Sequence, residues 1–547
     1  MSYRLSQLAP LPELRHVQIG KTIGHGGFGV VKSAVFEKNG ISKVIAVKFV
    51  HLDMARQQNV TADMLAREAF IQRECRHPNV IQLIDFGADI NWVWFAMELG
   101  SNGELFDKIE PDLGVDEDVA QFYFRQLINA VSFIHSKGVA HRDIKPENLV
   151  IDKNGNLKLT DFGLASVFKK RNGSKRMCTT ACGSPPYLAP EVVSQNYDPE
   201  PSDVWSCCIV LFVLLTGQIA WEMPHEEDTD FRYYMERKGE VLISPWNKIP
   251  LGALSLLRKV LVLEPSNRLS IEEIRKHPWV AKKNKFADQN DMCKDPMRLT
   301  TSLLVNLYIN LSDAEFNKIS QMSTQISRPS AGTQPPTYVM DDTQPAEIYK
   351  ENFWPIGGFS ASQEVYTEHS KRRKLKEDLG DDDLIFATIS KDPASLQFLR
   401  PDSVVNREKL INAKMSNLRI EQQRCPALFA ESLTRFFSTV ALDQLLVTIL
   451  EALSKLGLRS HSGEDASELY VENLRKNDLL SGLITIPING RDSSKAPIVG
   501  NIKVSRMADN LDVRKVEFLK IKADPLEWRR VFKRVTILCR DVVYVEK

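Results

Sequence analysis

Two polar motifs near the middle of the chain constrain its fold most strongly. The first is the octapeptide HRDIKPEN at residues 141–148, and the second is the tripeptide DFG at residues 161–163. The segment 150–158 between them reads as a β-hairpin. Such a hairpin would bring Asn148 and Asp161 side by side, and an amide carbonyl and a carboxylate are oxygen ligands suited to Mg²⁺.

The first motif also carries groups suited to phosphoryl transfer. Asp143 can accept the proton of a substrate hydroxyl that attacks the γ-phosphate of ATP, and Lys145 can steady the charge on that phosphate. Single Asp, Asn and Lys residues are usually solvated or cap helices. The assignment therefore depends on the other motifs that accompany this one.

A glycine-rich stretch, GHGGFGVV, lies earlier in the chain at residues 24–31, between two apolar and strand-like runs. Gly24, Gly26 and Gly29 would let the backbone approach phosphate oxygens and offer N–H groups to them. On its own this motif is weak, because a glycine-rich β-turn is an equally good interpretation.

A lysine on an apolar strand makes the phosphate interpretation the better one. Lys48 ends the run IAVK, and a charge packed among apolar side chains needs an anionic partner. The α- and β-phosphates of ATP would supply one partner, and a helix carboxylate would supply another. Glu68, in the helical stretch 62–75, is the candidate carboxylate, with an ordinary solvated helix glutamate as the alternative.

Two further residues complete the pattern in the same chain order. The tripeptide APE at residues 189–191 follows the DFG motif, and Arg268 follows later. We expect Arg268 to form a buried ion pair with Glu191, which would be a structural role.

These motifs together resemble those of the eukaryotic protein kinase family over residues 15–280. Lys145 and the sequence GSPPY at residues 183–187 are similar to its serine/threonine branch. The resemblance implies an α+β, bilobal fold with a β-rich N-lobe and a helical C-lobe, and with ATP and Mg²⁺ as cofactors between them. The nucleotide-binding residues that it implies are Gly24, Gly26, Gly29, Val31, Ala46, Lys48, Glu98, Gly100 and Glu104.

Further motifs narrow the resemblance. The sequences GELFD at 103–107, DVWSC at 203–207, SPWNKI at 244–249 and LTRFF at 433–437 are similar to the DNA-damage checkpoint kinase one family. This likeness implies a serine/threonine kinase that acts as an effector in checkpoint signalling and cell-cycle arrest. One departure is Cys208, where that family usually has glycine, and we expect it to alter only helix packing.

Substrate preference follows from two carboxylates that the kinase template places at the mouth of the site. Glu104 and Glu147 would bind an arginine through charge-assisted, bidentate hydrogen bonds. The resemblance implies that this arginine stands three residues before the Ser or Thr acceptor. The alternative is that Glu104 only contacts the ATP ribose.

The activation segment is the stretch between the DFG motif and the APE motif. The resemblance also implies that the kinase is active without phosphorylation of this segment. Thr179 and Thr180 leave this open, because Arg142 could pair with a phosphate on either of them.

The sequence becomes polar and irregular after the kinase-like segment, and it regains apolar periodicity further on. We assign an N-terminal extension at 1–14, a kinase domain at 15–280, a polar regulatory linker at 281–425 and a C-terminal domain at 426–547. Helical periodicity at 442–453, alternation at 484–488 and 502–504, and an amphipathic pattern near Trp528 predict a small α+β domain. It is similar to the kinase-associated domain of the same family.

The predicted linker contains a cluster of hydroxyl residues that each precede glutamine. They are Ser320, Thr324, Thr333, Thr343 and Ser362. Average composition gives about one such pair per 200 residues, so we interpret the cluster as phosphosites for upstream DNA-damage-sensing kinases presented by an adaptor. Each phosphate would add about −1.5 to −2 charges. Glutamine-rich low complexity is the alternative.

Charge and hydropathy limit the remaining partners. The formal net charge is +1, so no bulk field favours nucleic acid, and no apolar run of about 18 residues suggests a membrane span. The basic run KRRK at residues 371–374 is either a nuclear import signal or a solvated charge run. We expect a monomer that is nuclear with a cytoplasmic pool.

The regulatory hypothesis is that the terminal domain docks on the kinase domain and restrains it. Arg435 and the basic face near Trp528 would supply contacts, and linker phosphorylation would favour the open form. Two other functions compete: a metabolic-stress kinase with a kinase-associated domain, and a pseudokinase scaffold. The glutamine-directed cluster argues against the first, and the presence of Lys48, Asp143 and Asp161 argues against the second.

Overall fold

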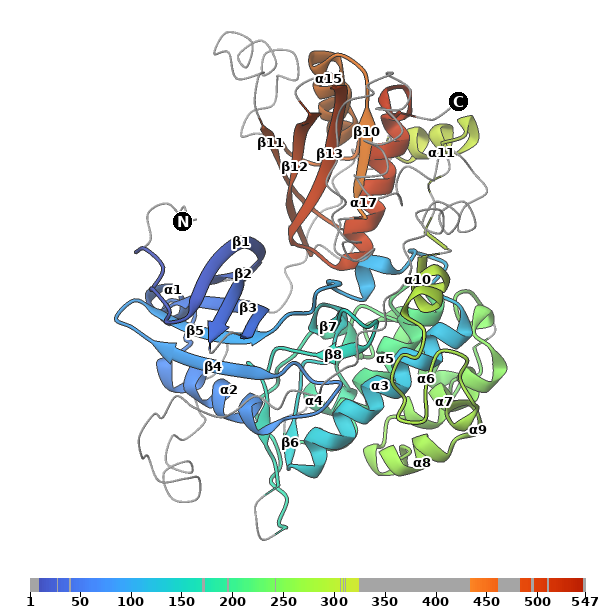
Figure 1. Ribbon diagram of the computed structural model, residues 1–547. Coiled ribbons are helices and arrows are strands. Elements are labelled where there is room, and N and C mark those ends of the chain that lie inside the picture. The colour runs from blue at the N-terminus through green and yellow to red at the C-terminus, as the bar shows by residue number, and fades with distance from the viewer. Residues whose placement is uncertain are drawn as a thin grey trace.

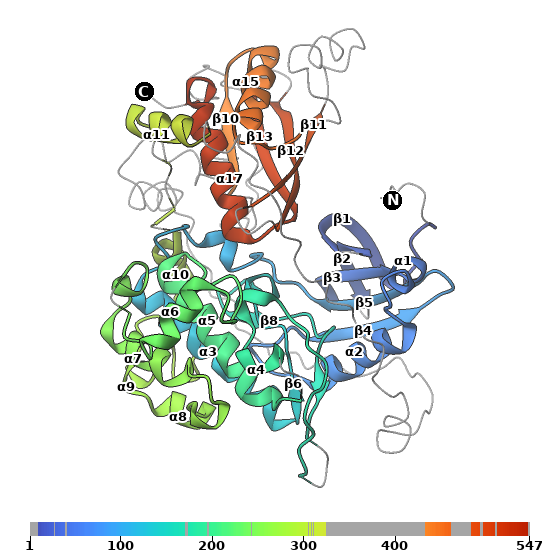
Figure 2. The ribbon, with the colours of Figure 1, turned by 180° about the vertical axis from the view of Figure 1, so that it is seen from behind.

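The computed structural model describes three bodies: a sheet-rich N-lobe, a helical C-lobe and a terminal domain (Figures 1 and 2). The described residues are 9–323, apart from 27, 39–40, 170–172, 194–195, 242, 305, 308 and 310, together with 433–460 and 483–544, apart from 493–495 and 509–510.

The N-lobe is built on an antiparallel sheet with the strand order β1-β2-β3-β5-β4. Its elements are β1 (Val17–Gly26), β2 (Gly29–Lys38), β3 (Ile41–His51), α1 (Leu52–Arg56), α2 (Ala62–Glu74), β4 (Leu83–Ala88) and β5 (Trp92–Glu98). Helix α2 begins after Thr61, whose side chain accepts a hydrogen bond from the Met64 N–H. Because β3 is the central strand and α2 packs beside β4 and β5, Lys48 and Glu68 come from neighbouring elements.

The C-lobe surrounds one long apolar helix, α5. Its elements are α3 (Glu117–Ser136), β6 (Val139–Ala140), β7 (Leu149–Ile151), β8 (Leu157–Leu159), β9 (Ser166–Val167), α4 (Pro190–Val193), α5 (Pro199–Thr216), α6 (Thr229–Glu236), α7 (Leu251–Val260), α8 (Ile271–Lys276) and α9 (Pro278–Ala281). By length and composition α5 could cross a membrane, but 89% of it is buried inside the protein. A helix that is apolar on all sides is expected at the centre of a lobe of this size.

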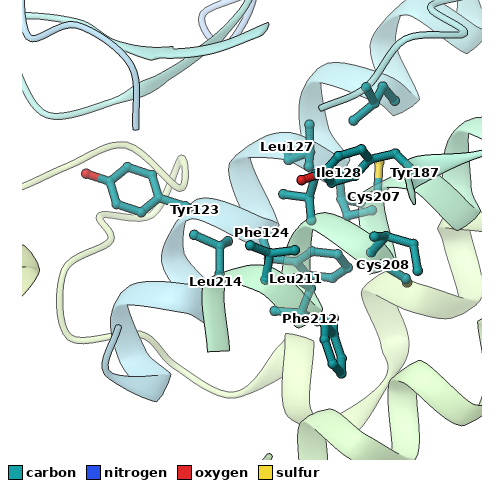
Figure 3. Packing of buried hydrophobic residues seen from close by; sticks show 14 of the residues in the cluster. Tyr123, Phe124, Leu127, Ile128, Tyr187, Cys207, Cys208, Leu211, Phe212 and Leu214 are labelled. Atoms are coloured by element: carbon teal, nitrogen blue, oxygen red, sulfur yellow. The ribbon is translucent and has the colours of Figure 1, made fainter. Parts of the chain in front are cut away.

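Cys208 lies in this core, on α5. Figure 3 shows Cys207 and Cys208 packed among side chains of α3 and α5, such as Phe124 and Leu211. Both thiols are fully buried, and burial raises the pKa of Cys208 well above its usual value. The residue that departs from the family pattern therefore serves as a small apolar side chain in the C-lobe interior.

The first part of the segment predicted to be a linker is packed rather than irregular. Phe286 is buried in the C-lobe core, and so is Leu299 of the helix α10 (Pro296–Leu304). The next helix, α11 (Asp313–Ser323), lies against the terminal domain through Ile319. Ser320, the first of the predicted phosphosites, lies on α11. The other four, Thr324, Thr333, Thr343 and Ser362, lie outside the described residues, as does the basic run 371–374.

The described residues of the terminal domain form a four-stranded antiparallel sheet, in the strand order β10-β13-β12-β11, and two helices. Its elements are β10 (Arg435–Ser438), α15 (Leu442–Lys455), β11 (Ile484–Arg491), β12 (Pro497–Ala508), β13 (Leu511–Lys522) and α17 (Pro525–Leu538). Inward-facing strand residues and both helices share one apolar core. Its described residues thus combine helices with an antiparallel sheet, and Trp528 lies on the helix α17.

Candidate active site

The core of the site is an ionic triangle that joins the two lobes. Lys48 Nζ lies 3.0 Å from Glu68 Oε1 and 3.4 Å from Asp161 Oδ1. Burial alone would lower the pKa of Lys48, but the two carboxylates outweigh it and hold that pKa above its usual value. Lys48 in turn is the main cause that lowers the pKa of Asp161. The predicted pairing of Lys48 with a helix carboxylate is therefore present in the structure.

Glu68 is buried, which raises the pKa of its carboxyl group, and the charge of Asp161 raises it further, against the attraction of Lys48. The two carboxylates thus depend on one lysine for compensation, since like charges in one site disfavour ionisation. A cation bound at Asp161 would relieve the same repulsion.

The residues around Asp143 form a second cluster. Its Oδ2 lies 2.8 Å from Lys145 Nζ and accepts a 3.2 Å hydrogen bond from Asn148 Nδ2, and its Oδ1 accepts a 3.0 Å bond from the Ser184 hydroxyl. Lys145 Nζ also donates to Ser184 Oγ at 2.9 Å. Asp143 thus already accepts a hydrogen bond from a hydroxyl, which is the contact that the predicted base would make with a substrate.

Asp203 holds the loop that carries this cluster. Its carboxylate accepts hydrogen bonds from the backbone N–H groups of His141 and Arg142, each at 2.8 Å, and it lies 2.8 Å from His135 Nε2. Arg142 has a φ of 65°, a region that is costly for a residue with a side chain. The buried carboxylate offsets that cost by satisfying two N–H groups at the turn. Arg142 Nε itself donates to Leu164 O at 2.8 Å.

The predicted hairpin is confirmed, and it aligns the two candidate metal ligands. Strands β7 and β8 pair with Leu149 opposite Leu159, and Thr160 N donates to Asn148 O at 3.0 Å. Asp161 follows directly. Since the amide nitrogen of Asn148 donates to Asp143, its carbonyl oxygen is the atom left for a cation. An amide oxygen beside a carboxylate of lowered pKa fits a hard divalent ion.

The predicted nucleotide-binding residues lie along β1, β2 and β3, at the end of β5 and in the segment that follows it. Gly24 stands opposite Val31, Val31 opposite Lys48, and Ala46 opposite Met97. Val31 therefore lies on β2 beside Ala46 and Lys48 of β3, so that the three residues can contact one bound nucleotide.

Two glycines of this region are required by close packing. A Cβ on Gly29 would come 2.0 Å from the carbonyl oxygen of Phe49, and a Cβ on Gly100 would come 2.6 Å from Val150 Cγ2. Gly29 therefore keeps β2 close to β3, in addition to any contact with phosphate.

Glu98 ends β5, where the chain passes between the lobes. Both of its carboxylate oxygens pair with Lys158 Nζ, at 2.8 and 2.9 Å. This side chain thus ties the segment to β8, and its backbone remains the part that can border a nucleotide base.

The predicted ion pair between Arg268 and Glu191 is confirmed. Arg268 Nη1 and Nη2 each donate to one Glu191 oxygen at 2.6 Å, which is a bidentate arrangement. The guanidinium also lies over the ring of Trp205, 4.8 Å from its centroid. The pair fixes the end of the activation segment to the C-lobe.

The structure brings the terminal domain against Glu104, one of the two predicted substrate carboxylates. Lys520 Nζ, at the end of β13, lies 2.6 Å from Glu104 Oε2 and 3.4 Å from Asp107 Oδ1. Lys520 and Asp107 were not predicted from the sequence. They are more than 400 positions apart, and no motif marks a lysine that reaches a distant lobe.

The rest of the interface is charged around one apolar anchor. Arg529 Nε pairs with Glu110 Oε2 at 3.0 Å, Lys533 pairs with the same carboxylate, and Arg530 Nη2 lies 2.8 Å from Asp112 Oδ1. At the start of α17, Leu526 joins the apolar core of the C-lobe. Three kinds of contact thus hold α17 on the kinase domain: buried charge, exposed charge and an apolar side chain.

The predicted basic face near Trp528 therefore does contact the kinase domain. Arg435, the other predicted contact, lies on β10 opposite Glu517 of β13, inside the terminal domain.

Known proteins resemble the chain over its whole length. The family model of the protein kinase domain matches residues 17–280. The serine/threonine-protein kinase CHK1 of Saccharomyces cerevisiae is 36% identical over 547 residues, which cover 99% of each chain. The chk1 kinase of Schizosaccharomyces pombe is 34% identical over 94% of this chain and 95% of its own.

Other kinases match only the first half. The CBL-interacting protein kinase 24 of Oryza sativa subsp. japonica is 40% identical, but over 48% of this chain and 56% of its own. Three relatives that also cover the terminal domain bear the CHK1 name, and they favour the checkpoint-type interpretation over the metabolic-stress alternative. The chain therefore belongs to the CHK1 family of serine/threonine protein kinases.

Proposed function

We propose that this kinase transfers the γ-phosphate of ATP, with Mg²⁺, to Ser or Thr in proteins that carry an arginine before the acceptor. The observation that carries the proposal is the joining of two clusters by the β7–β8 hairpin. Asp143 with Lys145 forms one cluster, and Lys48 with Glu68 and Asp161 forms the other.

Each group has a role that its surroundings support. Mg²⁺ bound at Asn148 and Asp161 would neutralise charge on the phosphates. Lys48 would orient the α- and β-phosphates, and Glu68 keeps its ammonium in place. Asp143 would accept the proton of the substrate hydroxyl, and Lys145 would neutralise charge on the transferred group.

The biological role that we propose is that of an effector in DNA-damage or replication checkpoint signalling, which leads to cell-cycle arrest. The CHK1 names of the full-length relatives and the cluster of glutamine-directed hydroxyls support it. Upstream damage-sensing kinases and an adaptor would modify the linker. The run KRRK at residues 371–374 supports a nuclear location with a cytoplasmic pool. We expect a monomer that does not bind nucleic acid directly.

The proposed regulation is restraint of the kinase domain by the terminal domain. The contacts of Lys520, Arg529 and Arg530 with kinase carboxylates support it. Contacts between β1 and β13 and between α17 and the 3-10 turn Phe106–Lys108 tie the terminal domain to both lobes. Phosphates added to the linker would compete with these carboxylates for the basic residues, and so shift the equilibrium towards an open form.

The test is phosphoryl transfer to a degenerate peptide library, with the wild type compared with Asp143→Asn. We expect arginine-directed phosphorylation of Ser and Thr that the variant loses. Transfer that persists in the variant would contradict the role of Asp143, and products without arginine enrichment would contradict the substrate assignment.

A further inference from the structure

Three carboxylates of the C-lobe gather at the mouth of the site. Glu104 and Asp107 share the ammonium of Lys520, and the charge of Glu147 acts on both Glu104 and Lys520. Glu104 and Glu147 are the pair predicted to receive the arginine of a substrate. Asp107 is an additional member that the structure supplies.

This group of carboxylates requires a cation. Burial, together with the neighbouring charge of Asp107, raises the pKa of Glu104 to about 7 despite the attraction of Lys520. Glu147 is also buried, and burial is the main cause that raises the pKa of its carboxyl group. Its Oε2 is buried without a hydrogen-bond partner among the described residues. A buried carboxylate oxygen without a donor is costly, so this atom marks a place for an incoming N–H group.

Lysine and arginine would fill the site differently. The ammonium of Lys520 is a point charge that reaches Glu104 and Asp107 and leaves Glu147 Oε2 without a donor. A guanidinium is planar and has five N–H donors, so it can reach a third carboxylate while it keeps the first two. A substrate arginine would therefore gain a hydrogen bond that Lys520 does not make.

The segment that follows Lys520 also approaches the substrate side of the site. Asp524, at the start of α17, is close enough to affect the pKa of both Glu147 and Tyr187 through its charge. Three residues after Lys520, where a substrate with a basic residue at the third position before the acceptor would carry its hydroxyl, the chain has Ala523. Ala523 packs against the core of its own domain. The segment thus offers a basic residue without an acceptor.

We propose that Glu104, Asp107 and Glu147 form one subsite for the basic residue of a substrate, and that Lys520 occupies it as an internal mimic of that residue. This inference rests on the proposed function and gives its regulation a chemical form. The terminal domain and an arginine-containing substrate compete for the same carboxylates. Docking therefore raises the KM for such substrates and leaves kcat at saturation unchanged.

The experiment uses the full chain and two peptides that differ only in arginine or citrulline at the third position before the serine. Citrulline keeps the shape and removes the charge. Wild type, Lys520→Met and Lys522→Met are compared, because Lys522 is an exposed lysine on the same strand. We expect Lys520→Met to lower the KM for the arginine peptide about fivefold to tenfold, as the loss of a partly buried charge contact would. The KM for the citrulline peptide and both kcat values should change less than about twofold.

Two further variants complete the design. Lys520→Arg keeps the charge and should keep the KM at or above the wild-type value, which separates competition from damage to the terminal domain. Asp107→Asn should narrow the preference for arginine over citrulline about fivefold, in line with one charged contact in a partly buried site.

The outcomes separate this inference from the function on which it rests. An equal fall in KM for both peptides in Lys520→Met would show that the terminal domain acts as a general cover, and it would overturn the mimic. A wild-type KM in Lys520→Met, or the same fall in Lys522→Met, would also overturn it. A lack of preference for arginine in every variant would contradict the proposed substrate recognition itself.

Discussion

Lys48 and Asp161 are 113 positions apart in the chain, yet their side chains approach within 3.4 Å across the boundary between the lobes. Glu68 lies on the other side of the same ammonium, at 3.0 Å. One cation therefore links an N-lobe strand, an N-lobe helix and the segment that holds the candidate metal ligand. The contact between Lys48 and Asp161 therefore holds the two lobes close together at the site.

Removal of that cation should abolish most activity without unfolding the sheet. Lys48→Met leaves Glu68 and Asp161 facing each other without compensation, so we expect kcat/KM to fall about 10²-fold to 10³-fold, as for loss of one electrostatic stabiliser. Steady-state kinetics with an arginine-containing peptide measure this. Lys43→Met, at an exposed position of the same strand, is the control and should retain activity. A fall of less than about tenfold in Lys48→Met would argue against its role.

Asp143→Asn should impair the chemical step and spare nucleotide binding. The amide retains the size of the carboxylate but cannot accept the proton of the substrate hydroxyl, so kcat should fall about 10²-fold to 10⁴-fold. Calorimetric titration with an ATP analogue should give a Kd within about twofold of the wild type, because Asp143 is placed at the acceptor side of the phosphate. A large loss of nucleotide affinity would indicate a structural role for Asp143 instead.

The ion pair between Arg268 and Glu191 should contribute strongly to the stability of the C-lobe. Arg268→Ala leaves a carboxylate without its bidentate partner and removes the guanidinium from the face of Trp205. We expect the free energy of unfolding of this lobe to fall by about 3–5 kcal/mol, as for other broken buried pairs. Urea unfolding followed by tryptophan fluorescence measures it. Arg268→Lys keeps the charge but cannot form the bidentate pair, so its free energy of unfolding should lie between those of the wild type and Arg268→Ala.

Asp203 should make the C-lobe sensitive to acid. Burial raises the pKa of this carboxyl group, but its hydrogen bond and charge contact with His135, and its bond from Arg142 N, outweigh burial and hold the pKa below the usual value of 3.8. A group with a lowered folded pKa contributes its full stability above the unfolded pKa and loses it as the pH falls through the folded value. The contribution of Asp203 should therefore be complete at pH 7 and at pH 5, and decline below about pH 4.

Asp203→Asn tests this dependence. The variant should be less stable at pH 7 by about 2–4 kcal/mol, because the amide cannot replace the charge at three hydrogen bonds. The difference from the wild type should shrink as the pH falls from 5 to 3.5. Unfolding midpoints in urea, measured over that range, give the comparison. A difference that stays constant with pH would show that the charge of Asp203 does not contribute.

Docking of the terminal domain should weaken when its exposed charge contact is removed. Arg530 pairs with Asp112 and donates to Gly217 O at 3.2 Å, so Arg530→Ala loses contacts with two segments of the C-lobe. We expect hydrogen exchange at residues 110–114 to become faster, and activity at low peptide concentration to rise about twofold to fivefold, as for a charge pair worth up to about 1 kcal/mol. Arg534→Ala, an exposed position on the same helix, should change neither measurement.

The catalytic residues were predictable because phosphoryl transfer limits which groups can act and in what order they occur. Asp143, Asn148 and Asp161 are brought together by a short hairpin that is itself readable from the chain. The pair of Lys48 with Glu68 followed from the cost of an unpartnered charge on an apolar strand. These inferences needed only local structure and one general fold.

The contacts between the terminal domain and the kinase domain could be predicted only in part. The sequence suggested a basic face near Trp528, and Arg529 would sit on the polar side of an isolated helix. In the structure Arg529 is buried and pairs with Glu110, which is also buried. Likewise, the packing of residues 286–304 on the C-lobe was hidden within a segment of polar texture. Both features arise from tertiary contacts between distant segments, which leave no periodic pattern.

The cluster of Glu104 and Asp107 has a consequence for how such a kinase can change over evolutionary time. A substitution that weakens the binding of a substrate arginine to this cluster also weakens its contact with Lys520. Substrate selectivity and the restraint of the resting enzyme therefore cannot evolve independently. Lineages in which the cluster changes to accept substrates with weaker basic motifs would inherit a kinase with higher basal activity, unless Lys520 changed at the same time.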